Sequence, residues 1–421
     1  MRETAPFRGL CKQQLNGSLR MWIRRHSKEK PCAEKEMRLT DGGFCAIIYK
    51  NGEKETVEMP IKEESFRIGC GRYRQRAGVL AEAGQEISRL GTSPMIIGDD
   101  TSLAVAGEVL MESVRAACTR FEVISHNGTC NDETARAIAE KRETLGYDVI
   151  VGVGGGVIMD FAKLCAHFAH VPVVNIPTSS ATCAAYTPLS VRYTPEGKTV
   201  GSLHYGYEVD AVLCDTAVML RQPARLFLAG VFDALAKFVE IKHRYREDTD
   251  EVYPLGLDYA YVLAKYTFSQ LDRDTALCLE DMKKGELTPR FENMIFATMA
   301  VTGVISGIAR GSNQTALGHK FYETTRILFP EAARPYLHGE IVGIGLLLQN
   351  HVNGEEANNA FLLDLMKKYG MPSRITDVGI TPTEETKQTY LAHLLKTSSM
   401  ENATAKDVER LQNSLAYLWQ L

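Results

Sequence analysis

One stretch decides the fold, and it reads Gly152-Val153-Gly154-Gly155-Gly156-Val157-Ile158-Met159-Asp160-Phe161-Ala162-Lys163. The apolar run that ends at Val153 predicts a buried parallel strand, and the spacing of apolar residues after Val157 predicts a helix. The glycines between them let a ligand approach the backbone, where the free N–H groups and the dipole of a helix favour a phosphate. The pattern is not GxGxxG, so a tight turn that binds no ligand remains the alternative interpretation.

The residues around this stretch alternate between strand and helix patterns. Strands are predicted at 66–69, 94–97, 121–125, 147–153 and 172–176, and helices at 75–90, 102–118, 131–145 and 157–170. Repeated β-α-β units with short connections predict a parallel sheet wound by helices, which binds ligands beyond the carboxyl ends of its strands. Asp99, Gly154 and Thr178 follow three strands, so we expect them to share one crevice. Asp99 could accept the hydroxyls of a ribose, or it could only cap a helix.

The second half of the chain has a different pattern. A hairpin is predicted from 189–193 and 199–203 and a strand at 211–214, and long helices follow at 224–243, 255–271, 291–309, 313–326, 339–352 and 356–368. We therefore predict a nucleotide-binding α/β domain at 64–222 and an all-α domain at 223–421. Residues 1–63 form an N-terminal extension with a basic tail and a hairpin around Asn51-Gly52. The tail covers residues 1 to about 37 and is expected to be flexible, and Met37 is an alternative translation start.

Composition excludes several classes of protein. The chain has 421 residues and a net charge of -4, so no global charge recruits nucleic acid or an anionic membrane. No uninterrupted apolar run is long enough to span a bilayer. The 10 cysteines show no CxxC or framework spacing, and several lie in apolar runs. This usage favours buried thiols in a reducing compartment, and we expect a cytoplasmic protein.

Three residues of the helical half form a candidate metal site. Asp233 is a carboxylate in an apolar helical segment, His319 follows Ala316-Leu317-Gly318, and His338 precedes a predicted helix. One carboxylate and two imidazoles suit a divalent metal with an open coordination position. The spacing forms no local motif, so three satisfied core residues remain the alternative.

Several motifs occur together in a fixed order. They are Gly154-Gly155-Gly156 with Asp160-Phe161-Ala162-Lys163, Pro177-Thr178, Leu189-Ser190-Val191, the segment from Ala224-Arg225 to Asp233-Ala234-Leu235-Ala236-Lys237, and the two histidine segments. Over residues 64–421 this order resembles the glycerol dehydrogenase branch of the iron-containing (group III) alcohol dehydrogenase family. The resemblance implies an NAD(P)-dependent oxidoreductase with a Rossmann-like domain and a helical, metal-bearing domain, as in dehydroquinate synthase-like folds.

The resemblance also implies roles for individual residues. Asp233, His319 and His338 match the ligands of a divalent metal, which is usually zinc in this branch, with iron as the alternative. Asp99 matches the acid that binds the adenosine ribose, so we expect NAD in preference to NADP. The positions that match the pyrophosphate turn and the nicotinamide half are Gly155, Gly156, Val157, Thr178, Thr187, Leu189 and Tyr193.

Three departures from the branch bear on the substrate. Cys183 stands where glycerol dehydrogenases have an aspartate that contacts the polyol, and a thiol cannot act as an anionic acceptor. The string 182–191 is similar to that of hydroxycarboxylate dehydrogenases, which reduce 2-oxo acids. Arg310 lies in a segment before His319 that is glycine-rich and uncharged in the glycerol dehydrogenases, and it could pair with a substrate carboxylate or could be a surface arginine. Tyr322 replaces the histidine that usually follows the first histidine ligand.

These features predict an enzyme that interconverts a small secondary alcohol and a ketone, with 2-hydroxy and 2-oxo acids among the candidates. We expect a homo-oligomer with a small-molecule substrate and no nucleic-acid or membrane partner. The alternative is a dehydroquinate synthase-like lyase that acts on a sugar phosphate with transient use of NAD. Such a lyase needs several basic residues for the phosphate, and Lys163, Lys237, Arg310 and Lys320 are the candidates.

Overall fold

The computed structural model describes residues 35–40, 43–50, 53–59, 66–247, 253–310 and 313–421. The chain divides into two compact units, residues 1–65 and 66–421. In the first, the strands β1 (Lys35–Thr40), β2 (Gly43–Lys50) and β3 (Glu53–Met59) form an antiparallel sheet in that order. β2 and β3 confirm the predicted hairpin, although Asn51-Gly52 and the tail 1–34 lie outside the described residues. β1 was not predicted, and it begins inside the segment that we assigned to the tail.

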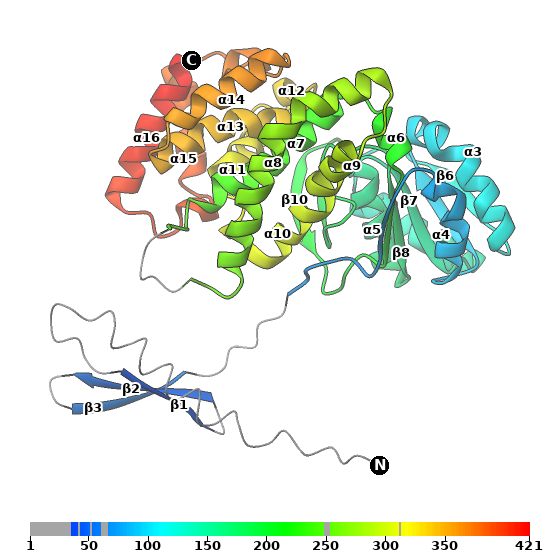
Figure 1. Ribbon diagram of the computed structural model, residues 1–421, viewed down its shortest axis with the longest axis horizontal. Helices are drawn as coiled ribbons and strands as arrows, with labels where there is room; N and C mark the ends of the chain where they lie inside the picture. The colour runs from blue at the N-terminus through cyan, green and yellow to red at the C-terminus, as the bar shows by residue number, and fades with distance from the viewer. Residues whose placement is uncertain (1–34, 41–42, 51–52, 60–65, 248–252, 311–312) are drawn as a thin grey trace, which may run out of the picture. The chain divides into compact units, whose positions relative to one another are not determined.

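The second unit contains a parallel sheet of six strands (Figure 1). Its order is β4 (Tyr73–Gln75), β11 (Ala211–Cys214), β8 (Val173–Pro177), β7 (Val149–Gly154), β5 (Pro94–Gly98) and β6 (Glu122–Ser125). The predicted strand at 66–69 is wrong, because the edge strand begins only at Tyr73. Gly71 packs so closely on the chain that an added Cβ would lie 2.6 Å from the carbonyl oxygen of Asp210. The ladder with β11 therefore starts after this contact.

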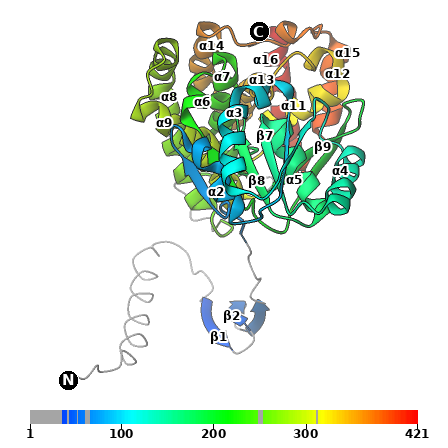
Figure 2. The ribbon, with the colours of Figure 1, turned by 90° about the vertical axis from the view of Figure 1, so that its right-hand side faces the viewer.

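Helices cover both faces of the sheet (Figure 2). On one face, Ile96, Val149 and Val151 share a buried cluster with η1 (Val79–Glu82), α2 (Ala83–Ser88) and α3 (Asp100–Ala117). On the other, Met95 and Ile150 pack with α4 (Asp132–Leu145) and α5 (Gly156–Ala169). This second cluster continues into the helical half of the chain, so the sheet and the helices share one core.

The helical half confirms the predicted all-α character. Its main helices are α6 (Thr216–Leu220), α7 (Ala224–Ile241), α8 (Leu257–Lys284), α9 (Pro289–Phe296), α10 (Thr302–Ala309), α11 (Leu317–Leu328), α12 (Pro330–Ala333), α13 (His338–Asn353), α14 (Ala357–Lys368), α15 (Glu384–Leu394) and α16 (Ala405–Gln420). A π-helical segment, η2 (Ala297–Val301), joins α9 to α10. The predicted hairpin is present as β9 (Leu189–Tyr193) and β10 (Thr199–His204). Residues 66–421 form one compact unit, so a domain boundary near residue 222 stays a prediction.

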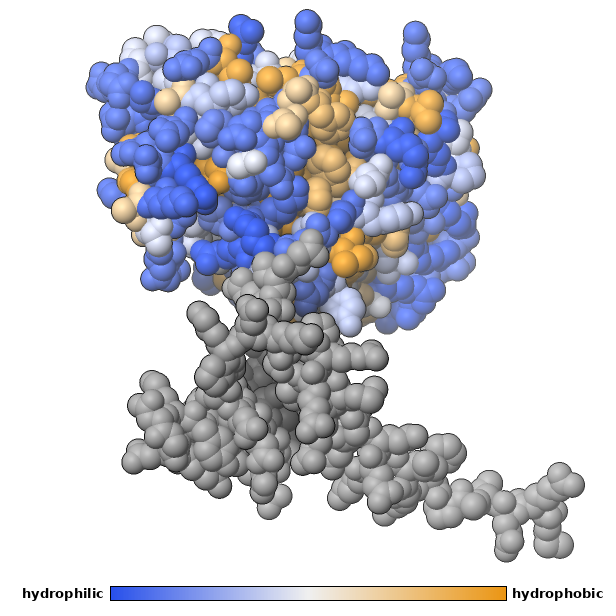
Figure 3. Space-filling view, turned by 60° about the vertical axis from the view of Figure 1, so that its left-hand side comes forward, coloured by the Kyte–Doolittle hydropathy of each residue, from blue (hydrophilic) through white to orange (hydrophobic). Residues whose placement is uncertain are grey.

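α7 lies at the centre of the helical half and packs against α8, α11 and α13. One helical run, Pro289–Ala309, is long and apolar enough to cross a membrane by length and composition alone, but 56% of it is buried inside the unit. The sequence analysis predicted a helix at 291–309 but no apolar run of spanning length. Figure 3 shows one face of the unit, where hydrophobic side chains form a band between largely hydrophilic surfaces.

Close packing of α7 against the loop after β8 gives a test of the fold. A Cβ on Gly230 would lie 1.8 Å from the carbonyl oxygen of Ser180, whose backbone N–H donates to Gln222 at 2.9 Å. We expect Gly230→Ala to lower the free energy of unfolding by about 1–3 kcal/mol through overpacking. Gly107→Ala on α3 meets no atom within 4 Å and should raise it by up to about 1 kcal/mol. Urea denaturation measures both, and equal effects would contradict the packing described.

Candidate metal centre

One face of α7 carries three buried ionisable side chains. Asp233, Lys237 and Glu240 lie one turn apart along the helix, with exposed fractions of 3%, 4% and 1%. The rest of α7 is apolar, because the helix is packed on several sides and buries almost every residue from Phe227 to Ile241. Charges in such a place must be balanced by partners, since an unpaired buried charge is costly.

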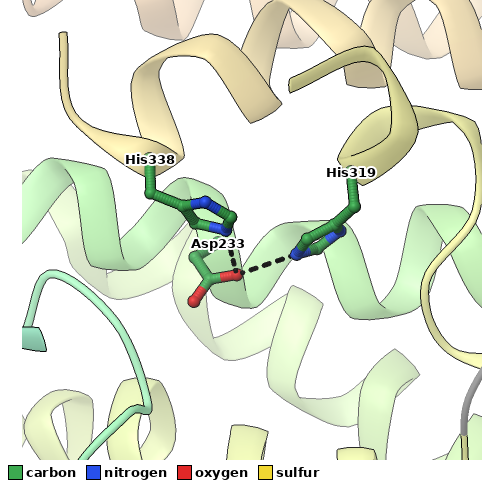
Figure 4. A group of neighbouring side chains, drawn as sticks. All are labelled: Asp233, His319 and His338. Atoms are coloured by element: carbon green, nitrogen blue, oxygen red, sulfur yellow. Dashed lines mark hydrogen bonds and ion pairs between the residues drawn. The ribbon is translucent and has the colours of Figure 1, made fainter. Parts of the chain in front are cut away.

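The three predicted ligands meet beside this face. His319 lies in the first turn of α11 and His338 is the first residue of α13. Their Nε2 atoms lie 3.3 Å and 3.6 Å from Oδ1 of Asp233, and one ligand atom from each residue falls within 4.8 Å of the others. Figure 4 shows both imidazoles directed at the carboxylate. Burial would raise the pKa of Asp233, but Lys237 and the two histidines hold it well below its usual range.

Glu240 fixes the orientation of His319. Its Oε1 accepts the backbone N–H groups of Ala316 and His319, each at 2.8 Å, and its Oε2 contacts Nδ1 of His319. A proton on Nδ1 leaves the lone pair of Nε2 directed at the site, which is the usual arrangement behind a metal-bound histidine. Glu240 was not predicted from the sequence. The signal was a second acid two helical turns after Asp233 on the same apolar face.

The carboxylates around His319 favour a positive charge on its imidazole ring. Burial lowers the pKa of His319, but the carboxylates of Glu240 and Asp233 raise it to about 9. Below this pKa both ring nitrogens carry a proton, and a divalent ion can take the place of the proton between Nε2 and Asp233. The donor set consists of two imidazoles and one carboxylate, and the carboxylate of Glu240 lies behind the imidazole of His319. This set therefore fits zinc or iron.

A separate ion pair holds the segment that carries His338. Glu340 lies two residues after it and accepts the backbone N–H of Leu337 at 2.8 Å. Arg225, at the start of α7, donates to both oxygens of Glu340 at 2.6 and 2.7 Å. The ring of Tyr322 packs edge-on against His338, with centroids 4.3 Å apart. The residue that departs from the family pattern therefore supports a predicted ligand by contact.

Cys183 lies close enough to Asp233 for the charge of that carboxylate to act on its thiol. It is buried, and burial together with the charge of Asp233 raises the pKa of its thiol to about 12. The loop after it is held by Lys163, whose Nζ donates to the carbonyl oxygens of Ala184 at 2.7 Å, Thr187 at 2.9 Å and Leu189, and pairs with Asp160 at 2.9 Å. This buried lysine thus positions two residues that we predicted to contact a cofactor.

The carboxyl ends of β5, β7 and β8 meet as predicted. The N–H of Thr178 donates to the carbonyl oxygen of Gly154 at 2.9 Å, and its hydroxyl lies 3.1 Å from that of Ser102. Ser102 donates to Asp99 through its backbone at 2.9 Å and through its hydroxyl at 2.7 Å. Asp99 therefore caps α3 beside the carboxyl ends of these strands. Its contact with a ribose stays a prediction.

The remaining predicted residues occupy different surroundings. Gly155 caps α5 and Val157 is 48% exposed in the first turn, while a Cβ on Gly156 would lie 2.9 Å from the hydroxyl of Thr182. Tyr193 is half-buried on β9, where burial and then Tyr322 raise the pKa of its hydroxyl. Arg310 ends α10 with a φ of 61° and stacks on Phe66, 3.9 Å from the ring centre.

Known proteins resemble this chain in sequence. The pattern of the family described as iron-containing alcohol dehydrogenase matches residues 70–219. A glycerol dehydrogenase of Thermotoga maritima is 31% identical over 318 residues, which cover 74% of this chain and 84% of the relative. A hydroxycarboxylate dehydrogenase A of Escherichia coli is 28% identical over 281 residues, which cover 65% of this chain and 75% of the relative.

Solved structures show the same fold. The glycerol dehydrogenase of Schizosaccharomyces pombe superposes with a TM-score of 0.73 at 22% identity, over 85% of this chain and 91% of the other. A probable glycerol dehydrogenase of Sinorhizobium meliloti gives 0.71 at 23% identity, over 85% and 98%. The predicted architecture, a wound parallel sheet followed by a helical part, is confirmed.

The contact between Glu240 and His319 generates a test of the metal site. We expect Glu240→Gln to weaken zinc binding by about 10–100-fold, because an amide orients and polarises the imidazole less well than a carboxylate. Competition with a chromophoric chelator measures the affinity. As a control, Asp281→Asn removes another buried acid, which pairs with Arg290 at 2.8 Å on α8. It should change stability and leave zinc affinity unaltered, whereas an unaltered affinity in Glu240→Gln would refute the role of this carboxylate.

Proposed function

This chain belongs to the iron-containing alcohol dehydrogenase family, and we propose that it is a metal-dependent, NAD-linked oxidoreductase. In this proposal it interconverts a small secondary alcohol and the corresponding ketone. The observation that supports it most is the convergence of Asp233, His319 and His338 on one point, with Glu240 behind His319. We propose zinc as the ion, with iron as the alternative, and NAD in preference to NADP.

The residues of the chain bind and orient the reactants. When bound, a divalent ion supplies Lewis-acid polarisation of the substrate oxygen, and the nicotinamide supplies the carbon that accepts or gives the hydride. Asp233 and the two imidazoles would hold the ion. Gly155 and Gly156, at the start of α5, would bind the pyrophosphate through backbone N–H groups. Lys163 fixes the loop that carries Thr187 and Leu189, so the nicotinamide half would meet a pre-formed surface.

We propose a 2-hydroxy acid and its 2-oxo acid as the substrate pair. The buried thiol of Cys183 keeps its proton, so it offers no anionic acceptor for a polyol and does not repel a carboxylate. The similarity to a hydroxycarboxylate dehydrogenase supports the same choice. Arg310 remains a candidate partner of the substrate carboxylate. The lyase alternative is not favoured, because the relatives described above are dehydrogenases.

We further propose a cytoplasmic homo-oligomer that acts on small molecules. Seven described cysteines, from Cys70 to Cys278, are free thiols, which supports a reducing compartment. Large apolar side chains on α8, including Tyr259, Val262 and Tyr266, are more than 60% exposed, which supports association through a surface of this kind.

Steady-state oxidation of NADH by the zinc-loaded protein tests the function. We expect turnover of 2-oxobutyrate and 2-oxoglutarate in preference to dihydroxyacetone, and loss of all turnover in a chelator. His319→Ala should lower kcat/KM by at least about 10³-fold, because the ion loses a ligand and the substrate loses its polarising group. Circular dichroism controls for folding. Full activity in metal-stripped protein would refute the proposed function. Preference for dihydroxyacetone would support a dehydrogenase but refute the proposal that Cys183 disfavours polyol-type substrates.

Cofactor choice tests the role of Asp99. A carboxylate at the ribose repels the extra phosphate of NADP. We expect the wild type to prefer NADH and Asp99→Asn to raise the relative kcat/KM for NADPH by about 10-fold, since an asparagine still caps α3 but carries no charge. Asp100→Asn is the control, because Asp100 follows it directly and instead accepts from Asn127 at 2.9 Å. A wild type that prefers NADPH would contradict this role.

A further inference from the structure

Two lysines are buried near the metal centre, and they differ in how their ammonium groups are satisfied. Lys163 is 2% exposed and has three carbonyl oxygens and Asp160 around Nζ. Lys237 is 4% exposed, and the nearest carboxylate oxygen is Oδ1 of Asp233 at 3.8 Å, which is beyond hydrogen-bond distance. Across the described parts of the chain, Nζ of Lys237 donates no hydrogen bond. A buried ammonium in this state lacks a strong acceptor.

The charges around Lys237 do not balance once a divalent ion is bound. Asp233 and Glu240 carry two negative charges, while Lys237 and the ion would carry three positive ones. Lys163 is already paired with Asp160, and Cys183 stays neutral because its pKa is raised to about 12. One positive charge therefore remains in a buried site, where an unpaired charge is costly. A ligand with a single negative charge would bring the site to neutrality, and a neutral polyol would not.

The position of Lys237 favours one orientation of a bound substrate anion. It lies one helical turn after Asp233, and its Nζ lies 3.8 Å from Oδ1 of Asp233, the same oxygen that Nε2 of both histidines approaches. A carboxylate held by this ammonium would place the carbon bonded to it next to the three ligands. That carbon is the reacting centre of a 2-oxo or 2-hydroxy acid. A longer spacer would carry the reacting carbon away from the site.

We propose that the ammonium of Lys237 is the subsite for the carboxylate at C1 of a 2-oxo or 2-hydroxy acid. This assignment rests on the proposed function, and it places recognition of the anion on α7 instead of on Arg310. Lys237 is then a substrate-binding residue that sets specificity, and its ammonium takes no part in hydride transfer.

The test compares two substrates of nearly the same shape. 2-Oxobutyrate carries a carboxylate where 1-hydroxy-2-butanone carries a neutral hydroxymethyl group. In Lys237→Met we expect the ratio of their kcat/KM values, acid over ketone, to fall by about 10–100-fold, as for the loss of one charged hydrogen bond. The ratio does not depend on the fraction of protein that is folded. Lys237→Gln, which is shorter and polar, serves if the methionine variant does not fold.

Two further variants sharpen the comparison. Lys242→Met removes the same charge from the same helix, but Lys242 has its own partner in Glu355 at 2.6 Å, so the ratio should not change. Arg310→Gln tests the other candidate partner of the carboxylate, and we expect a smaller fall of the ratio there than in Lys237→Met. A fall of the ratio in Arg310→Gln with none in Lys237→Met would overturn the proposal.

A binding measurement separates this subsite from the proposed function. Oxamate is a monoanionic analogue of a 2-oxo acid, and calorimetric titration into the zinc-loaded protein with NADH measures its affinity. We expect Lys237→Met to bind oxamate at least about 10-fold more weakly. It should bind zinc at least as tightly as the wild type, because a like charge has been removed. Loss of zinc with unchanged oxamate affinity per bound zinc would show a structural role and overturn the subsite. Failure of the wild type to turn over either of these substrates or dihydroxyacetone would refute the proposed function, and oxamate binding would still decide the subsite.

Discussion

The burial of charge on α7 is the constraint on which the helical half depends. Asp233, Lys237 and Glu240 sit among apolar side chains with almost no access to water. The two carboxylates need partners, and these come from segments far along the chain. α11 brings His319 to Asp233 and Glu240, and α13 brings His338 to Asp233. Because unpaired buried charges are costly, the requirement fixes how these helices meet. The same requirement leaves a place that a divalent ion fits.

The ends of the sheet strands are linked to α7 by hydrogen bonds and close packing. The carboxyl ends of β5, β7 and β8 are tied together by a chain of hydrogen bonds from Asp99 through Ser102 to Thr178. The loop after β8 continues to Cys183 and is anchored on Lys163 of α5. The close approach of Gly230 to Ser180 then joins this loop to α7. The carboxyl ends of these strands and a site suited to a metal are therefore connected through one short segment.

Much of the fold could be predicted from local patterns. Short-range patterns of apolar residues and glycines predicted the glycine turn and the alternation of strands and helices. They also predicted the change to long helices after Pro223. Asp233, His319 and His338 could be named only through the order of several motifs, since 86 and 105 residues of sequence separate Asp233 from the two histidines with no local spacing. Glu240 was missed because an acid on a buried helix gives no sign of its partner until the fold is known. The edge strand was misplaced because its start depends on the contact of Gly71 with Asp210, and β1 was missed because its charged residues resemble those of the tail.

The most direct test of the metal centre is anomalous diffraction from crystals of the zinc-loaded protein. The account predicts one strong peak among Asp233, His319 and His338, about 2.0–2.2 Å from the carboxylate oxygen and from Nε2 of each histidine, with Nδ1 of His319 still bonded to Glu240. A peak held by other residues, or an ion bound through Nδ1 of His319, would contradict it.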